Sequence, residues 1–156
     1  MRFQVVPAAY VLPVREVEGR TQLLLQLRRN TGYYDAHWAC ASAGHVEEGE
    51  SVLAAAVREA SEELGVAIDP ADLEPLTVMH RSQLNGNPIE ERVDFFFACR
   101  RWSGEPRIVE PEKCGGLQWY DVDALPDPIV PHELVVIGAI ARGEAPPMVT
   151  PYGFDA

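Results

Sequence analysis

The sequence predicts an α/β fold in which a mixed β-sheet lies between helices, within one domain that spans residues 1–156. The predicted elements follow the order strands, helix, strands, helix, which is the first reason for this prediction. The second is size and composition: 156 residues with 47% hydrophobic and 24% charged side chains are ordinary for one globular domain. We find no internal repeat, linker or low-complexity segment that would divide the chain.

Two strands are expected before the first helix. Residues 4–15 are rich in Val, Ala and Tyr, and residues 21–29 contain the run Leu23-Leu24-Leu25, which suits a sheet covered on both faces. The sequence Asn85-Gly86-Asn87-Pro88 predicts a turn between two later strands. The further expected elements are a short strand at 37–42, a helix at 51–64, strands at 76–84, 92–100 and 117–121, a helix at 132–142 and a loosely structured tail at 143–156.

The helix at 51–64 has an unusual distribution of charge. On a helix, Glu59, Glu62 and Glu63 fall within an arc of roughly 100°. Ser51 can cap its start, and Gly65 can take the left-handed conformation that ends it. An adjoining apolar arc is expected to bury one side of the helix; it consists of Val52, Leu53, Ala56, Val57, Ala60 and Leu64.

These carboxylates destabilise the helix that carries them. Like charges four residues apart cost roughly 0.2–0.5 kcal/mol per pair. Glu62 and Glu63 also lie near the C-terminus, where the helix dipole disfavours anions. A divalent cation would reverse both penalties, and carboxylate oxygens suit Mg²⁺, Mn²⁺ or Ca²⁺. The alternative interpretation is an acidic, solvated helix face.

The stretch from residue 44 to residue 66 resembles the Nudix box at every fixed position. Those positions are Gly44, Glu50, Arg58-Glu59-Ala60, Glu62-Glu63 and Gly65-Val66, and the box covers 23 of the 156 residues. Nudix proteins have an α/β/α sandwich fold, so the resemblance implies the fold class that the element order permits.

The resemblance also implies a reaction. Similar proteins hydrolyse a diphosphate linkage in a nucleoside diphosphate derivative or a nucleoside triphosphate, releasing a nucleoside monophosphate and a phosphate-bearing product. They use Mg²⁺ or Mn²⁺, which screens the phosphate charge and lowers the pKa of bound water. By resemblance, the metal ligands are Glu59, Glu62, Glu63 and the carbonyl of Gly44.

The box does not decide which residue is the general base. Glu59 and Glu63 are the candidates inside it, and Glu50 either supports metal binding or acts as the base. Arg58 is expected to point away from the three ligands and to hold Glu50 in place, as outer partners of metal ligands do.

Two positions depart from the family pattern. Relatives commonly carry an acid three residues before a tryptophan strand, where this chain has Gly116 ahead of Trp119. Glu110 and Glu112, slightly upstream, are the candidates to replace it, and an exposed acidic loop is the alternative. Ala43 replaces a glycine that often precedes the box, and its small side chain should preserve the turn.

The loop RRNTGYYDAHW resembles that of a MutT-like bacterial group, and we expect it to contact substrate. Arg28 and Arg29 could pair with phosphates, and Tyr33 or Tyr34 could stack on a base. His45, directly after the box glycine, could approach the phosphates. The alternatives are a solvated strand end for the arginines and core packing for the tyrosines.

Charge and cysteine content limit the partners. The formal net charge of −11 argues against nonspecific binding of a nucleic acid polymer, which leaves a small nucleotide as the expected partner. Cys40, Cys99 and Cys114 form no CxxC pair and predict buried thiols in a reducing compartment. The N-terminal stretch is too short and too broken by proline for a signal peptide, so a soluble, cytoplasmic protein is expected.

Two rival functions keep the same fold. One is a catalytically weak domain that binds or senses a nucleotide, which a degraded box would favour. The other is an isomerase, which would need a Cys and a Glu in the pocket, with Cys40 or Cys99 as the cysteine. The sequence identifies neither the nucleobase nor X, the moiety that is linked to the diphosphate in the substrate. It also leaves a homodimer open.

Overall fold

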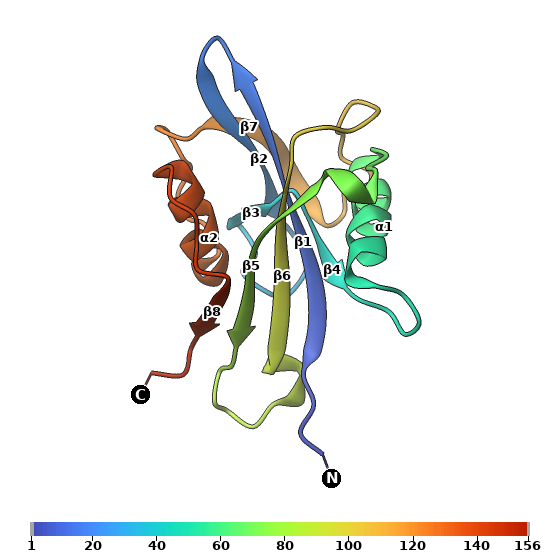
Figure 1. The fold of residues 1–156 in the computed structure, drawn as a ribbon, viewed down its shortest axis with the longest axis vertical. Helices are drawn as coiled ribbons and strands as arrows, with labels where there is room; N and C mark the ends of the chain where they lie inside the picture. The colour runs from blue at the N-terminus through green and yellow to red at the C-terminus, as the bar shows by residue number, and fades with distance from the viewer. Residues whose placement is uncertain (1, 156) are drawn as a thin grey trace.

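The computed structural model describes residues 2–155, which form a mixed sheet of eight strands between two α-helices (Figure 1). The predicted fold class is confirmed. The elements are β1 (Val6–Val17), β2 (Arg20–Arg28), β3 (Trp38–Cys40), β4 (Ser42–His45), α1 (Val52–Leu64), β5 (Leu73–Arg81), β6 (Arg92–Cys99), β7 (Cys114–Asp121), α2 (Pro131–Ala141) and β8 (Val149–Tyr152), with 3₁₀ turns at Pro70–Asp72 and Pro88–Glu90.

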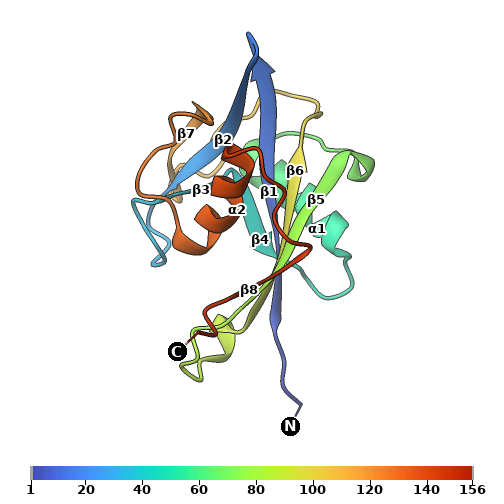
Figure 2. The same ribbon diagram turned by 60° about the vertical axis from the view of Figure 1, so that its left-hand side comes forward.

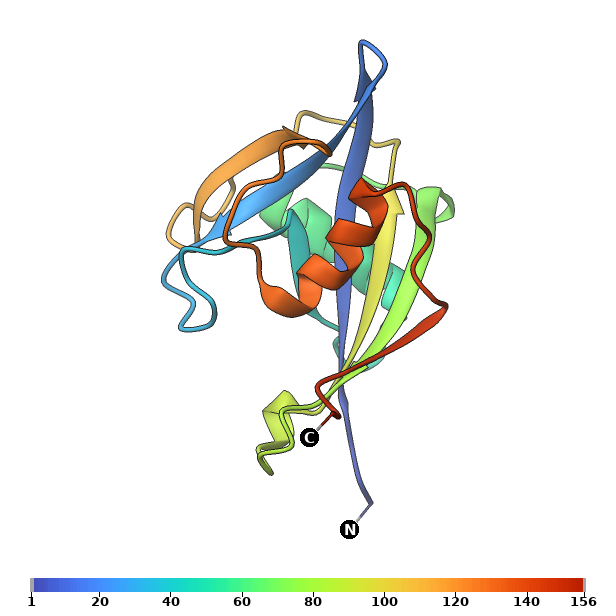
Figure 3. The same cartoon turned by 90° about the vertical axis from the view of Figure 1, so that its left-hand side faces the viewer.

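The long strand β1 connects the two parts of the sheet. The strand order is β3-β2-β1-β6-β5-β8, with β4 paired to β1 and β7 paired to β2. The β1–β6 and β5–β8 pairs are parallel, and the others are antiparallel. Helix α2 lies on one face and α1 on the other, which Figures 2 and 3 show from the side of α2.

Side-chain alternation along β1 explains how one strand serves two cores. Ala8, Tyr10 and Leu12 pack in the cluster that includes α2, whereas Ala9 and Val11 pack in the cluster that includes α1. Because both faces are covered, the strand carries a continuous apolar run instead of a polar alternation.

Helix α1 begins and ends as its sequence predicts. The Ser51 side chain accepts a hydrogen bond from the Ala54 N–H at 3.0 Å, and Gly65 ends the helix with φ of 69°. The buried face is slightly rotated from the expected arc, because Ala55 is fully buried while Leu53 remains 41% exposed. The prediction of Leu53 as an anchor is therefore wrong.

The segment predicted as one strand at 37–42 forms two strands. Residues of β3 pair with β2, and residues of β4 pair with β1, so the chain changes its partner strand at Ala41. This change delivers Ala43 and Gly44 to the edge of β1, next to α1. The position of the turn at Gly44 thus depends on the pairing of β4 with β1, which the local sequence does not encode.

Part of the tail that was predicted to be loosely structured forms a strand, which corrects the prediction for the described residues 143–155. Its residues Val149–Tyr152 form β8, which adds to β5 in parallel. The buried hydroxyl of Thr77 donates to the Pro147 carbonyl at 2.6 Å and lies 2.8 Å from the Thr150 hydroxyl. The strand is short and contains Pro151, so its own pattern was too weak to predict it. None of the described helices is long and apolar enough to cross a membrane.

Candidate functional site

Gly44 and Glu59 are packed directly against each other. A Cβ atom added at Gly44 would lie 2.2 Å from the carboxyl carbon of Glu59. The absence of a side chain at Gly44 therefore leaves room for the Glu59 carboxylate beside the β4 backbone, and the φ of Gly44 lies outside the left-handed region. This contact places the Glu59 carboxylate beside the backbone of Gly44, the position whose carbonyl the resemblance assigns to the metal.

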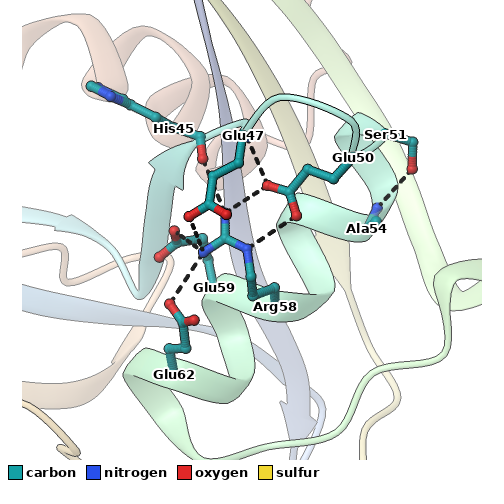
Figure 4. A network of polar contacts seen from close by, with 8 residues as sticks. All are labelled: His45, Glu47, Glu50, Ser51, Ala54, Arg58, Glu59 and Glu62. Atoms are coloured by element: carbon teal, nitrogen blue, oxygen red, sulfur yellow. Dashed lines mark hydrogen bonds and ion pairs between the residues drawn. The ribbon is translucent and has the colours of Figure 1, made fainter.

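Arg58 is the centre of a network of carboxylates (Figure 4). Its guanidinium bonds to Glu50 at 2.7 Å and to Glu59 at 2.7 Å, and it lies 3.2 Å from Glu62. It also donates to the carbonyl of His45 at 3.1 Å, which ties the helix to the end of β4. The structure confirms the contact with Glu50.

The expectation that Arg58 points away from the ligands is wrong. Its Nη1 atom lies between the Glu59 and Glu62 carboxylates, because the long arginine side chain folds back along the helix surface. The ion pairs with Glu50 and Glu59 raise the pKa of Arg58, which stays charged. A guanidinium in this position shows that the carboxylates gather around positive charge.

Glu63 faces a different environment from Glu62. Its Oε2 atom accepts a hydrogen bond from the Ala43 N–H at 3.0 Å, and burial raises its pKa to about 8. It lines a cavity of about 330 Å³ together with Glu110, Lys113 and Arg28. Burial also raises the pKa of Glu59, against the opposing effect of Arg58.

Of the two acids proposed to replace the one missing at Gly116, only Glu110 reaches this cavity. Glu112 is exposed, and it is its backbone carbonyl that accepts a hydrogen bond, from Asn30 at 3.2 Å. Gly116 itself packs against Trp38, since an added Cβ would lie 3.3 Å from that ring. The geometry favours Glu110 over Glu112 beside Glu63.

The loop after β2 is held by its own polar residues. The Asp35 carboxylate accepts from the N–H groups of Thr31 and Gly32, both at 3.0 Å, and from the Thr31 hydroxyl at 2.6 Å. These hydrogen bonds, led by Thr31, lower the pKa of Asp35. Tyr34 and Ala36 have φ angles of 48° and 64°, an uncommon conformation that costs energy for side-chain-bearing residues.

This loop places Arg28 and Tyr33 at the cavities but directs Arg29 elsewhere. Arg28 donates to the Tyr33 carbonyl at 2.7 Å and lines both the 330 Å³ cavity and a second one. Arg29 instead donates to the Pro111 carbonyl. Tyr34 packs edge-on against Tyr33 and His37 and lines a small third cavity of about 200 Å³.

The second cavity measures about 490 Å³ and begins where the first one ends. Arg28, Thr31 and Ala43 line both. Gly44 and His45 belong to its wall, and partial burial lowers the pKa of His45. The expected position of His45 near a substrate pocket is consistent with this wall.

A buried charged cluster behind the second cavity escaped the sequence analysis. Asp94 on β6 is fully buried and forms an ion pair with Arg81 on β5. His132 at the start of α2 lies 3.9 Å from Asp94, and burial lowers its pKa to about 2. Glu133, also buried, accepts from the Cys40 N–H at 2.8 Å. These residues come from separate elements, so no local motif marks them.

The carboxylates fit a divalent cation by their chemistry and by the close approach at Gly44. They are not preassembled, because in residues 2–155 no three His, Cys, Asp or Glu side chains form a ready metal centre. Arg58 holds Glu59 and Glu62, while Glu63 is bonded to the backbone of Ala43. Metal binding by these residues thus requires side-chain rotation within a fixed backbone.

The two cysteines that were candidates for an isomerase, Cys40 and Cys99, do not fit that role. Cys40 and Cys99 are fully buried in opposite core clusters, and burial raises the pKa of each thiol. Cys114 is half-buried and lines the 330 Å³ cavity with Glu63 and Glu110, and its pKa is also raised by burial. No motif in the sequence predicts that Cys114 lines this cavity.

Comparison with known proteins identifies the family. A family model described as NUDIX domain matches residues 5–137. The chain belongs to the NUDIX family. The crystal structure of a MutT NUDIX hydrolase from Burkholderia pseudomallei is 30% identical with a TM-score of 0.68, covering 85% of this chain and 96% of the other. The predicted Nudix family is confirmed.

Two further relatives show how widely the fold is used. An isopentenyl-diphosphate Delta-isomerase from Serratia proteamaculans is 31% identical over 120 residues, or 76% of this chain, which spans 64% of that relative's length. The NUDIX domain of Shewanella oneidensis NrtR, in a structure with ADP ribose, has a TM-score of 0.68 at 14% identity, covering 90% of this chain and 88% of the other. The second likeness concerns the fold alone.

Proposed function

We propose that this Nudix protein hydrolyses a diphosphate linkage in a nucleoside diphosphate derivative or a nucleoside triphosphate, with Mg²⁺ or Mn²⁺ as cofactor. The products are a nucleoside monophosphate and a phosphate-bearing product. The observation that carries this proposal is the gathering of Glu59 and Glu62 around one guanidinium, with Glu59 packed on Gly44. Carboxylates that enclose positive charge suit a cation that neutralises phosphates.

Glu59, Glu62 and Glu63 would hold the metal, with the carbonyl of Gly44 as a further oxygen ligand. When bound, such a cation screens the phosphates and activates water. Arg58 is bonded to Glu50 and Glu59 and lies 3.2 Å from Glu62, so it orients these three carboxylates. Its bond to the His45 carbonyl fixes the helix against the Gly44 turn.

Of the two candidate bases in the box, Glu63 is the better supported. In the metal-free protein, burial raises the pKa of Glu63 to about 8, so its carboxyl takes up a proton more readily than that of an exposed glutamate. Its bond to the Ala43 N–H holds the carboxyl at the edge of the 330 Å³ cavity, where Arg28 and Lys113 supply positive charge for phosphate oxygens.

Substrate turnover by single variants tests this function. Glu62→Gln and Glu63→Gln should each lower kcat by about 100-fold or more with the fold retained, since each variant removes a charged group that acts in the reaction. A panel of nucleoside diphosphate derivatives and triphosphates with Mg²⁺ would be followed by phosphate and nucleotide release. Glu48→Gln, an exposed residue in the same box, is the matched control. The hydrolase proposal fails if folded, metal-supplied wild type releases nothing from any diphosphate.

An isomerase is the second candidate, because the chain is 31% identical to an isopentenyl-diphosphate Delta-isomerase and Cys114 lines a cavity with Glu63 and Glu110. The raised pKa of Cys114 disfavours the thiolate that proton abstraction would use. Isopentenyl diphosphate with Mg²⁺, monitored by NMR, should remain unchanged. Isomerisation that Cys114→Ser abolishes would replace the hydrolase proposal. A purely nucleotide-sensing role predicts tight nucleotide binding without turnover in the same panel.

The domain organisation and the cellular location are two further parts of this proposal. We propose that residues 1–156 act as one domain, which the pairing of β8 with β5 supports. Three cysteines without disulfides suit a reducing compartment and support a cytoplasmic location.

A further inference from the structure

The second cavity is lined by three arginines from three strands. Arg28 belongs to β2, Arg81 to β5 and Arg92 to β6, and all three side chains line the same 490 Å³ space. They are at least half-buried, and Arg81 is only 4% exposed. The chain has 13 basic residues and a net charge of −11, so this local concentration of guanidinium groups runs against the charge of the whole molecule.

The acids nearby leave part of this positive charge uncompensated. Asp94 forms an ion pair with Arg81, which neutralises that arginine. Glu133 lines the cavity but is buried, and this burial raises its pKa to about 7, so that it is partly protonated at neutral pH. Glu90 is half-exposed in the wall. Arg28 and Arg92 therefore have no fully charged, buried carboxylate of their own within hydrogen-bond distance.

Arg92 is the least satisfied of the three. Its Nη1 atom donates to the Ile89 carbonyl at 3.3 Å, but its buried Nε atom has no hydrogen-bond partner among residues 2–155. The nearest carboxylate oxygen, Oδ1 of Asp94, is also buried without a hydrogen bond among these residues; it lies 3.9 Å away, which allows an ion pair but no hydrogen bond. A guanidinium that is buried with incomplete hydrogen bonding is costly, and its terminal nitrogens can donate to a planar oxyanion in the cavity.

The field of these arginines also reaches the neighbouring histidines. Arg81, Arg92 and Arg28 each lower the pKa of His132, after the larger effect of burial. Arg92 and Arg81 lower the pKa of His45 in the same way. These effects favour the neutral form of both imidazoles, which can still donate or accept hydrogen bonds.

We propose that this arginine cavity binds an anionic group of the substrate, a phosphate or carboxylate of X beyond the scissile diphosphate. Arg92 and Arg28 contact the anion, and Arg81 is held by Asp94 and Tyr33 as the rigid back of the site. The cavity meets the carboxylate helix at Gly44, so one substrate can extend from one to the other. The substrate in this inference rests on the proposed function, whereas binding of an anion by the cavity does not.

Binding of inorganic phosphate to metal-free protein tests the anion site without catalysis. In EDTA the carboxylates of α1 have no metal to recruit phosphate, so calorimetric titration reports on the arginine cavity. Wild type should bind, and Arg92→Gln should weaken the affinity by about tenfold or more, because one charge-assisted contact is lost. Arg28→Gln serves as the second variant if thermal denaturation shows that Arg92→Gln does not fold.

Arg100→Gln is the matched control. It removes the same charge from the residue directly after β6, where Arg100 is exposed and pairs with Glu74 at 3.2 Å, outside the cavity. It should bind phosphate as wild type does. Absence of phosphate binding in wild type, or an equal loss in Arg92→Gln and Arg100→Gln, would overturn the proposal.

Paired substrates distinguish a group of X from free phosphate or the diphosphate itself. Coenzyme A and its 3′-dephospho form, and NADPH and NADH, share a diphosphate and differ by one phosphate monoester. Wild type should favour the phosphorylated member of at least one pair by about tenfold in kcat/KM, and Arg92→Gln should remove that preference. Equal activity on both members, or an equal fall for both in Arg92→Gln, contradicts the assignment to X. Loss of all hydrolysis with phosphate binding intact would defeat the proposed function and leave the anion site standing.

Discussion

Two charged clusters of opposite composition lie on either side of the Gly44 turn. On α1, one guanidinium, that of Arg58, is surrounded by carboxylates and remains partly accessible to solvent. In the sheet, one carboxylate, that of Asp94, is fully buried between Arg81 and Arg92. The first cluster has an excess of negative charge and suits a cation. The second has an excess of positive charge and suits an anion.

The difference also concerns how each cluster is held in place. The α1 carboxylates belong to one helix and are partly or fully exposed, so water screens their ion pairs. The sheet cluster is fixed by strands on both sides and by α2, where burial strengthens each interaction and penalises any unpaired charge. A diphosphate substrate that needs both a metal and a rigid anchor would use one cluster for each.

The largest expected effect on stability comes from breaking the buried cluster. Asp94→Asn should lower the free energy of unfolding by about 3 kcal/mol or more, because it leaves two buried guanidinium groups without a carboxylate. Urea denaturation measures it. Glu74→Gln, which breaks the exposed pair with Arg100, should cost about 1 kcal/mol or less. Equal losses in the two variants would show that the buried Asp94 ion pairs stabilise the fold no more than the exposed Glu74–Arg100 pair does.

A smaller effect is expected from the pH dependence of Glu133. Its pKa is about 7 in the folded protein, above the ordinary value of 4.5, so the native state binds more protons between these values. The free energy of unfolding contributed by Glu133 therefore falls as the pH rises from about 4.5 to 7, by about 1–3 kcal/mol.

Glu133→Gln should remove this fall while keeping an oxygen to accept from the Cys40 N–H. Relative to wild type, the variant should gain stability between pH 5 and pH 8 in urea titrations. Glu63, with a pKa of about 8, keeps part of the slope in both proteins. Glu144→Gln, at an exposed residue, is the control. A difference that stays constant with pH would contradict the assigned protonation of Glu133.

The smallest effect on stability is expected at the solvent-accessible carboxylates around Arg58. Arg58→Gln should lower stability in EDTA by about 1 kcal/mol, because Glu50, Glu59 and Glu62 lose their common cation. Saturating Mg²⁺ should stabilise the variant more than wild type, since the ion replaces the missing charge. Thermal denaturation with and without Mg²⁺ measures both. A Mg²⁺ effect no larger than that of wild type would mean that these carboxylates do not bind the ion.

The sequence predicted the carboxylate helix well because its information is local. Helical periodicity places Glu59, Glu62 and Glu63 together, and the ends at Ser51 and Gly65 depend on side chains within a few residues. The direction of Arg58 was wrong, since a long side chain can fold back over its own helix and no spacing rule describes that.

The residues of the second cavity could not be predicted in the same way. Arg81 and Arg92 are cross-strand partners in the β5–β6 pair, but Arg28 lies far from both in the chain. Only the position of β2 in the sheet brings Arg28 to the same space. The strand β8 was missed because parallel pairing with β5, and not its own pattern, stabilises it. Glu110 could be chosen over Glu112 only once the chain was folded around Glu63.

The sequence by itself thus determined the fold class and the carboxylate helix of this protein, because alternation, helical spacing and end residues act over a few positions. The tertiary structure decided which arginines meet, which acids are buried and where the cavities lie. Those properties depend on strand order and register, which join residues such as Arg28 and Arg92 across the sheet through long-range pairing.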